Sequence, residues 1–363
     1  MKGKLGFGLM RLPRKGISID IKETCEMIDM FLDRGFNYFD TAHIYPGSEV
    51  AAQKALFSRH DRESFTIATK LFAPVVPTKK MAENEFYESL KRMKTDYIDY
   101  YLLHFLNDMN YKKYERFELW DFVQKRKDEG KIKHIGFSFH GGPEVLDEIL
   151  SAHPEVEFVQ LQINYADWEN PGVQGRKNYE VVRKYDKQLV IMEPVKGGRL
   201  ADPPKAVKAL FDKVNPNASY ASWAIRFAAS LDGLLSVLSG MSTLKQVDDN
   251  TTFMSNFTPL SKDEREAINE AQKVFAESKE IPCTACHYCT EGCPKQIPIP
   301  DVFSVYNKRM TTGEFEESAK AYEELKNKGS VASDCIACKK CEQVCPQHIK
   351  ISEHMKEIRE VFT

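Results

Sequence analysis

The sequence predicts an α/β protein, with a (β/α)8 TIM barrel over residues 1–275 and a small α-helical domain over residues 276–363. Three observations lead to this prediction. Short apolar strand patterns alternate with helical patterns, polar residues stand where those strands end, and eight cysteines lie in two runs near the C-terminus. Alternation of this kind over roughly 250 residues is typical of a closed parallel barrel. A chain of 363 residues has room for that barrel and a second domain.

Eight runs rich in β-branched and aromatic residues recur at intervals of roughly 30 residues. They are Leu5–Leu9, Phe36–Asp40, Thr66–Lys70, Ile98–His104, His134–Ser138, Phe158–Gln162, Leu189–Glu193 and Leu235–Ser239. The segments between them place apolar residues at helical spacing, with polar residues at the other positions. Such segments include Lys22–Arg34, Lys79–Met93, Phe117–Glu129 and Pro143–Ser151. Eight strand–helix units in about 270 residues indicate a closed barrel.

Polar residues end the second, third and fourth predicted strands, and barrels of this class carry their function at that rim. Strand two ends at Asp40 with Tyr45 soon after it, strand three at Lys70 and strand four at His104. Each residue alone has an ordinary explanation, such as a helix cap, a solvated lysine or a hydrogen-bonded core histidine. Together they indicate proton transfer. A nearby ammonium favours the phenolate of a tyrosine, a carboxylate holds the lysine, and an imidazole orients a carbonyl oxygen.

Eight of the nine cysteines form two runs, Cys283–Cys293 and Cys335–Cys345, with two, two and three residues between successive cysteines and a proline after the last. This doubled spacing is typical of two [4Fe–4S] clusters, in which the fourth cysteine of each run ligates the other cluster. The predicted ligands of one cluster are Cys283, Cys286, Cys289 and Cys345. Those of the other are Cys335, Cys338, Cys341 and Cys293.

Zinc is the alternative metal, but four-thiolate zinc sites usually consist of two separate cysteine pairs. Clusters that serve structure alone are a second alternative, because a buried metal centre stabilises a small domain with little core. The 41 residues between the runs contain two segments rich in helix formers, Asp301–Arg309 and Phe315–Lys326. The C-terminal domain therefore resembles the α-helical ferredoxin modules of fumarate-reductase-type iron–sulfur subunits.

Composition sets further expectations. Acidic and basic residues nearly balance, at a formal net charge of -2, so we expect no nucleic-acid partner. The first residues carry no apolar signal region, and no stretch approaches the roughly 20 apolar residues of a spanning helix. We therefore expect a cytoplasmic protein with no membrane partner. Cysteines confined to two runs also differ from the scattered cysteines of a secreted disulfide framework.

Three motifs, Asn37–Tyr45, Thr66–Lys70 and Asp99–His104, resemble those of the aldo-keto reductase family. The resemblance extends over most of residues 1–275. It implies that Tyr45 is a proton donor tuned by Asp40 and Lys70. It implies that His104 orients the substrate. The residues that it implies as contacts of NADPH or NADH are Gly8, Met10, Arg11, Ser138, Gln160, Asn164, Met192, Gly240, Met241, Ser242, Gln246 and Asn250.

The sequence departs from the family's pattern at four positions. Gly240 and Gln246 stand where many members place Lys and Arg beside a 2′-phosphate, so both NADH and NADPH stay as candidates. Met192 replaces an aromatic residue that stacks on the nicotinamide, and Phe139 replaces an asparagine. The sequence has neither a Rossmann glycine motif nor a Walker loop, so a nucleotide would be held by the barrel's own loops, with residues 239–250 as its cradle.

These observations predict an oxidoreductase that reduces a small carbonyl, or oxidises the alcohol, with NAD(P)H at the barrel rim. The two clusters would exchange electrons with a one-electron redox partner or hold the domains together. Hydride transfer moves two electrons and a cluster accepts one, so a flavin in the barrel mouth is a further hypothesis, although no flavin motif is visible. The alternatives are an electron-transfer or flavin-linked component whose barrel only binds a ligand, and a cluster-based redox sensor. The sequence predicts neither the substrate nor the oligomeric state.

Overall fold

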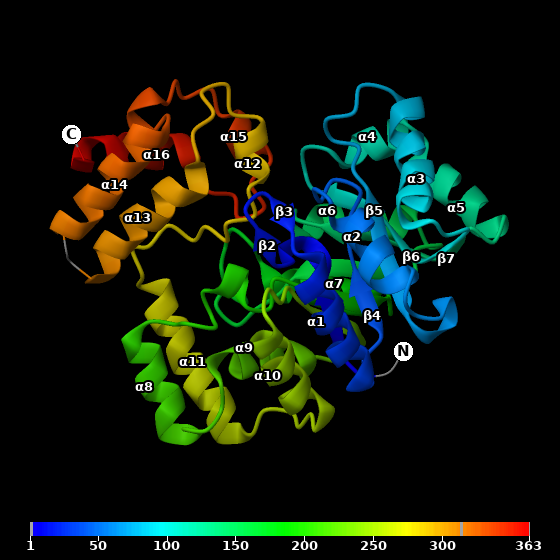
Figure 1. Cartoon of the computed structure of the whole chain (residues 1–363), viewed down its shortest axis with the longest axis horizontal. Coiled ribbons are helices and arrows are strands. Elements are labelled where there is room, and N and C mark those ends of the chain that lie inside the picture. The colour runs from blue at the N-terminus through cyan, green and yellow to red at the C-terminus, as the bar shows by residue number, and fades with distance from the viewer. Residues whose placement is uncertain (1–2, 313–314, 363) are drawn as a thin grey trace.

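A computed structural model describes residues 3–312 and 315–362 of the chain. Within these residues eight parallel strands close into a barrel in chain order, with β10 paired to β1 (Figure 1). The strands are β1 (Leu5–Gly8), β4 (Tyr38–Asp40), β5 (Thr66–Leu71), β6 (Ile98–Leu106), β7 (Ile132–Phe139), β8 (Phe158–Gln162), β9 (Gln188–Met192) and β10 (Leu234–Ser239). Each predicted run contributes one strand, so the (β/α)8 fold is confirmed.

Helices surround the barrel, and two short strands, β2 (Arg14–Lys15) and β3 (Ser18–Ile19), form a hairpin beside it. The helices of this part are α1 (Ile21–Asp33), α2 (Ser48–Ala52), α3 (Lys79–Met93), α4 (Tyr111–Arg116), α5 (Leu119–Asp128), α6 (Pro143–Ala152), α7 (Gly175–Lys184), α8 (Lys205–Val214), α9 (Tyr220–Ala229), α10 (Leu244–Ser255) and α11 (Lys262–Ala276). Helix α3 has the predicted bounds. The Thr78 hydroxyl caps its start, and Lys94 ends it in the left-handed conformation.

The strand ends differ slightly from the predicted runs, for reasons that the turns explain. Strand β4 begins at Tyr38 because Gly35 turns the chain with φ +84°, which leaves Phe36 buried in the turn before the strand. Strand β6 continues past His104 to Leu106. The interior of the barrel is filled by large side chains, including Tyr38, Leu102 and Phe158. Because the interior is packed, a ligand has room only at the rim.

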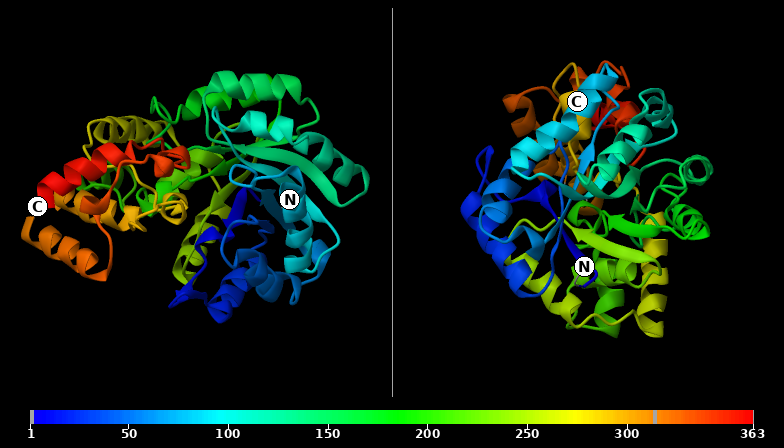
Figure 2. Two further views of the ribbon diagram at one scale, coloured as in Figure 1. Left: turned by 90° about the horizontal axis from the view of Figure 1, so that it is seen from above. Right: turned by 90° about the vertical axis from the view of Figure 1, so that its right-hand side faces the viewer.

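The C-terminal domain is helical and lies at one end of the molecule (Figure 2). Its helices are α12 (Tyr288–Glu291), α13 (Ile299–Thr312), α14 (Phe315–Lys328), α15 (Lys340–Gln343) and α16 (Ile351–Phe362). A separate apolar core that includes Phe303, Tyr322 and Ile358 joins these helices. None of the helices in the described part of the chain has the length and apolarity needed to cross a membrane.

Candidate active site

The four predicted rim residues converge at the C-terminal ends of β4, β5 and β6. Lys70 is the second-last residue of β5, and its side chain is 0% exposed. Its ammonium lies 2.5 Å from Asp40 Oδ1 and donates a hydrogen bond of 2.6 Å to the carbonyl oxygen of Thr41. Buried charges persist only when they are paired in this way. Asp40 and Lys70 therefore form one rigid unit beneath the rim.

Tyr45 and His104 lie above this unit. The Lys70 ammonium is 5.4 Å from the centroid of the Tyr45 ring. The Tyr45 and His104 rings are 5.8 Å apart between centroids and nearly perpendicular, at 81°. The structure thus brings together the phenol, the ammonium, the carboxylate and the imidazole that the sequence places at successive strand ends.

Burial dominates the protonation states of these residues. It raises the pKa of Tyr45 well above its usual value, with further increases from Tyr288 and Asp40, so the phenol is protonated at neutral pH. The Lys70 ammonium was expected to favour the phenolate, and desolvation outweighs that effect here. Burial also lowers the pKa of His104 well below its usual value, which keeps the imidazole neutral. The site therefore holds a protonated phenol beside a neutral imidazole.

Burial acts against both charges of the pair below them. It raises the pKa of Asp40 and lowers the pKa of Lys70, and in each case the charge of the partner opposes the shift. The ion pair is the ionised state that their mutual attraction supports. Asp40 Oδ2 has no partner among the described atoms, so the carboxylate directs only one oxygen at the lysine.

A cavity of about 650 Å³ opens over the rim, and Asp40, Tyr45 and His104 line it. That volume is within the usual range of small-molecule and cofactor sites. Ten of the twelve predicted cofactor contacts line the same cavity. They are Gly8, Met10, Arg11, Gln160, Met192, Gly240, Met241, Ser242, Gln246 and Asn250.

The other two predicted contacts, Ser138 and Asn164, are fully buried and do not line the cavity. The Ser138 hydroxyl oxygen accepts a hydrogen bond of 2.8 Å from the backbone N–H of Phe105. The Asn164 side-chain N–H donates to Asp167, at 2.8 Å, and to the carbonyl oxygen of Glu193. Both side chains thus support the rim from below in this structure.

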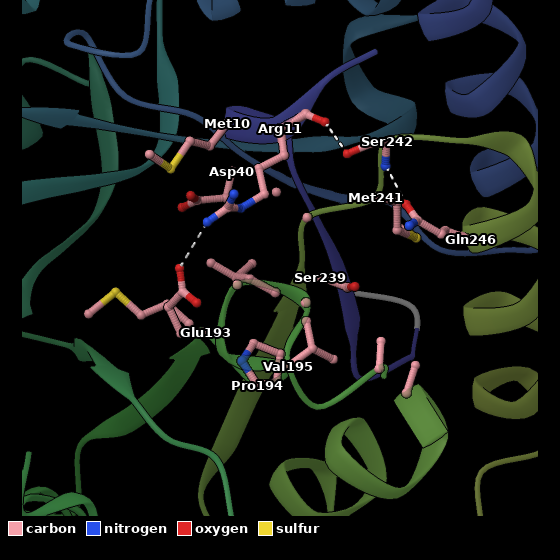
Figure 3. A pocket seen from close by; sticks show the side chains of 18 of the residues that line it. Met10, Arg11, Asp40, Glu193, Pro194, Val195, Ser239, Met241, Ser242 and Gln246 are labelled. Atoms are coloured by element: carbon pink, nitrogen blue, oxygen red, sulfur yellow. Dashed lines mark hydrogen bonds and ion pairs between the residues drawn. The ribbon is translucent and has the colours of Figure 1, made fainter. Parts of the chain in front are cut away.

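The segment between β10 and α10 forms one wall of the cavity (Figure 3). The Ser242 hydroxyl donates a hydrogen bond of 2.6 Å to the carbonyl oxygen of Arg11, and the Ser242 N–H donates to Gln246 Oε1 at 2.7 Å. Thr243 caps the start of α10. The loop is therefore fixed against the strand-one segment, with a helix N-terminus beside it, an arrangement that suits a phosphate group.

Gln160 supplies an unused polar atom at the wall of the cavity. Its Nε2 contacts the Met192 sulfur at 3.3 Å, while its Oε1 is buried and has no partner among the described atoms. A buried acceptor of this kind is costly unless a ligand satisfies it. The residues present therefore fit a nicotinamide cofactor, with Gln160 as the acceptor for its amide and residues 239–250 as the cradle.

The C-terminal domain completes the wall of the cavity through Cys286, Tyr288 and Pro346. The Tyr288 ring packs edge-on against Phe105, at 5.6 Å between centroids, and lies 6.4 Å from His104. Tyr288 also contributes to the raised pKa of Tyr45. Tyr288 was not predicted, because it lies far away in the sequence. The only signal was an aromatic residue between two predicted cluster ligands.

Direct hydrogen bonds hold the two domains together beside the cavity. Gln162 and Gln347 form two hydrogen bonds between their side-chain amides, at 2.8 and 3.1 Å. Arg11 donates to the carbonyl oxygen of Thr284 at 2.6 Å and lies 3.7 Å from Glu193 (Figure 3). The Arg11 guanidinium, a predicted cofactor contact, is thus engaged by the C-terminal domain.

The eight cysteines surround two further cavities. The first, here called the inner cavity, is lined by Cys283, Cys286, Cys289 and Cys345. The second, here called the outer cavity, is lined by Cys293, Cys335, Cys338 and Cys341. These are the two predicted ligand sets, each combining three cysteines of one run with the last of the other. Among the described residues, no three His, Cys, Asp or Glu side chains meet closely enough to bind a single metal ion.

Comparison with known proteins identifies both parts of the chain. Residues 4–273 match the model of the Aldo/keto reductase family, and residues 282–349 match that of a 4Fe-4S dicluster domain. The chain is 27% identical over 145 residues to the uncharacterized oxidoreductase YrpG of Bacillus subtilis (strain 168), which covers 35% of the chain and 43% of YrpG. The chain thus matches less than half the length of YrpG. It is 26% identical over 223 residues to the methylglyoxal reductase DkgA of Escherichia coli O157:H7, covering 53% of the chain and 78% of DkgA.

Solved structures with a similar fold cover the barrel part. The aldo-keto reductase AKR11C1 from Bacillus halodurans, in its holo form, has a TM-score of 0.61 and 25% identity, and the match covers 74% of this chain and 91% of that one. An aldo/keto reductase from Klebsiella pneumoniae in complex with NADP and acetate has a TM-score of 0.61 at 19% identity, with the same coverage, and shows the shared fold.

Proposed function

The chain belongs to the aldo/keto reductase family and is an oxidoreductase, and from this premise we propose that it reduces a small carbonyl compound, or oxidises the corresponding alcohol, with NADPH or NADH. The observation that carries the proposal is the Tyr45 phenol, held above the buried Lys70–Asp40 pair at the wall of a cofactor-sized cavity. The buried, unpartnered Gln160 Oε1 in the same cavity supports the choice of cofactor class.

The side chains divide the work of carbonyl reduction. A nicotinamide held by Gln160 and residues 239–250 would supply the hydride. Tyr45 donates its phenolic proton to the carbonyl oxygen, and the Lys70 ammonium stabilises the phenolate that remains. Asp40 keeps the lysine charged and in place despite its burial. His104, neutral in this site, donates a hydrogen bond that orients the carbonyl oxygen beside Tyr45.

We further propose that the inner and outer cavities hold one [4Fe–4S] cluster each, on the two cysteine sets that line them. Such clusters supply one-electron exchange. Cys286 lines both the inner cavity and the barrel cavity, which favours electron exchange with the molecule bound at the rim over a purely structural role. A flavin bound at the rim would accept electrons singly or in pairs, and it stays a candidate cofactor on that chemical ground.

An anaerobic activity survey tests the proposed function. Oxidation of NADPH and NADH is followed across aldehydes, ketones and sugars, with and without a one-electron acceptor and with and without added flavin. We expect carbonyl-dependent oxidation of one nicotinamide cofactor. Turnover that requires flavin or the one-electron acceptor, with no direct carbonyl reduction, would favour the flavin-linked alternative.

A further inference from the structure

Three cavities follow one another from the barrel rim to the surface of the C-terminal domain. The barrel cavity and the inner cavity share Cys286. The inner and outer cavities share the side chains of Ile299 and Ile351. Groups bound in the three cavities would therefore be separated only by single side chains, and the outer cavity is the end of the series farthest from the rim.

The outer ligand set contains the more exposed cysteine. Cys338 is exposed, and Ile336, two residues before it, is 58% exposed. In the inner set Cys289 is buried and the other three cysteines are partly buried. A separate protein can therefore contact the outer ligand set at Cys338.

The charged side chains that line the outer cavity are all basic. They are Lys295, Lys339 and Lys340, each exposed to solvent. Across the ranges that the structure describes, none of the three is paired with a carboxylate, although ion pairs are common elsewhere on the surface. Exposed lysines of this kind contribute little to stability, because water and salt screen them. Their positive potential is available to an approaching molecule.

Two acidic residues close to Lys339 and Lys340 in sequence, Asp334 and Glu342, accept local hydrogen bonds. Asp334 Oδ2 accepts a hydrogen bond of 2.9 Å from the backbone N–H of Val331. Glu342 Oε1 accepts from both the N–H and the hydroxyl of Ser352, at 2.8 and 2.6 Å. Neither carboxylate forms an ion pair with the three lysines within the described ranges, and neither lines the outer cavity.

We propose that the lysine collar, defined as Lys295, Lys339 and Lys340 around the exposed Ile336 and Cys338, is the docking surface for a small acidic one-electron carrier protein. An apolar contact at the centre with charged residues around it is the usual anatomy of such an interface. Complementary charge at the rim steers the encounter and sets its rate. The inference rests on the proposed function only in that the outer cysteines hold a redox-active cluster.

Binding to the anaerobic holoprotein tests this surface without any measurement of turnover. The probe is an acidic plant-type [2Fe–2S] ferredoxin, and a basic cytochrome c serves as the probe of opposite charge. The test variant is Lys339→Glu with Lys340→Glu. The matched control is Lys54→Glu with Lys91→Glu, which makes the same charge change at two exposed barrel lysines.

We expect the ferredoxin to bind, the binding to weaken as salt is added, and the test variant to lose about tenfold or more of the association rate while the control pair keeps it. Visible absorbance reports whether each variant retains its clusters. If the double variant loses them, the single variant Lys295→Glu replaces it. Equal ferredoxin binding by test and control variants, no ferredoxin binding at all, or tighter binding of cytochrome c would overturn the proposal.

Carbonyl reduction with the nicotinamide cofactor, measured on the same variants, separates this proposal from the proposed function. The lysine collar lies outside the barrel cavity, so its substitution leaves that activity unchanged if both proposals hold. Loss of ferredoxin binding with full carbonyl reduction therefore supports the docking surface by itself. If the unmodified protein reduces no carbonyl compound, that result contradicts the proposed function and leaves the docking surface untouched.

Discussion

Tyr288, a residue of the cysteine-rich domain, lies close enough to the phenol of Tyr45 in the barrel to raise the pKa of that phenol. Tyr288 lies between two cysteines of the inner cavity, Cys286 and Cys289. The conformation of this loop therefore bears directly on the phenol proposed as the proton donor. Loss of a cluster from the inner cavity would move Tyr288 and so change its interaction with Tyr45.

Replacement of Tyr288 by phenylalanine removes the hydroxyl and keeps the ring packing. We expect kcat for carbonyl reduction to fall by about tenfold, because loss of one polar interaction with Tyr45 costs on the order of 1 kcal/mol. KM should change little, and the visible absorbance of the clusters should stay. An unchanged kcat would restrict Tyr288 to packing. Tyr288→Leu, which also removes the ring, should affect KM as well.

Two neighbouring glycines test how closely the domains fit. Gly197 has φ +66°, and a Cβ there would lie 2.8 Å from Thr284 Cα and still closer to the Thr284 carbonyl oxygen. Gly198 has φ +100°, and a Cβ there would meet nothing within 4 Å. Both alanine variants strain the backbone, but only Gly197→Ala forces the domains apart. We expect faster hydrogen exchange of residues 281–289 in that variant alone, and equal exchange in the two variants would contradict this account.

Removal of both charges of the buried Asp40–Lys70 ion pair should restore stability but not activity. Lys70→Met leaves Asp40 buried without its partner, which should cost about 3–5 kcal/mol of the free energy of unfolding. The double variant Asp40→Asn with Lys70→Met removes both charges and should recover most of that stability. It should remain inactive, because no ammonium then stabilises the phenolate. Chemical denaturation and carbonyl reduction measured on both variants provide the check, and an active double variant would exclude the role given to Lys70.

Glu85 predicts a dependence of stability on pH. Burial raises its pKa to about 7, against a bond from the Phe72 N–H that lowers it. The folded state therefore holds the proton more tightly. The protonated Glu85 side chain therefore contributes to the free energy of unfolding. This contribution is fully present below the unfolded pKa of about 4.5 and is lost as the pH rises towards 7.

Glu85→Gln should match the unmodified protein near about pH 4 and exceed its free energy of unfolding by up to about 3 kcal/mol near about pH 8. Denaturation at the two pH values measures this difference. Glu83→Gln, the same substitution on the same helix, is the control. A constant difference between Glu85→Gln and the unmodified protein across this range would show that Glu85 does not titrate there.

The sequence predicted the parts of the site that local patterns encode. Runs rich in β-branched and aromatic residues located the eight strands. The ends of these runs located Asp40, Lys70 and His104, because parallel strands bring their ends to one rim. The cysteine spacing predicted which cysteines of the two runs would share a cavity. In each case the signal lies within a few residues of the feature that it predicts.

Contacts between distant segments left no such signal. Tyr288 and the Gln162–Gln347 pair depend on how the second domain sits on the barrel, which no local pattern encodes. Ser138 and Asn164 lie on the predicted strands and loops, but their hydrogen bonds to Phe105 and Asp167 hold them beneath the cavity wall. The pKa of Tyr45 depends on burial, which the order of residues along the strands does not reveal.

The most direct test of the central claim is Tyr45→Phe, measured anaerobically in the holoprotein with the cofactor and carbonyl substrate that the survey identifies. The variant keeps the ring that packs beside His104 and loses only the proton donor. We expect nicotinamide binding and the visible absorbance of the clusters to be unchanged and carbonyl reduction to fall by at least about a thousandfold, within the range for loss of a general acid. Carbonyl reduction at the rate of the unmodified protein would contradict the account.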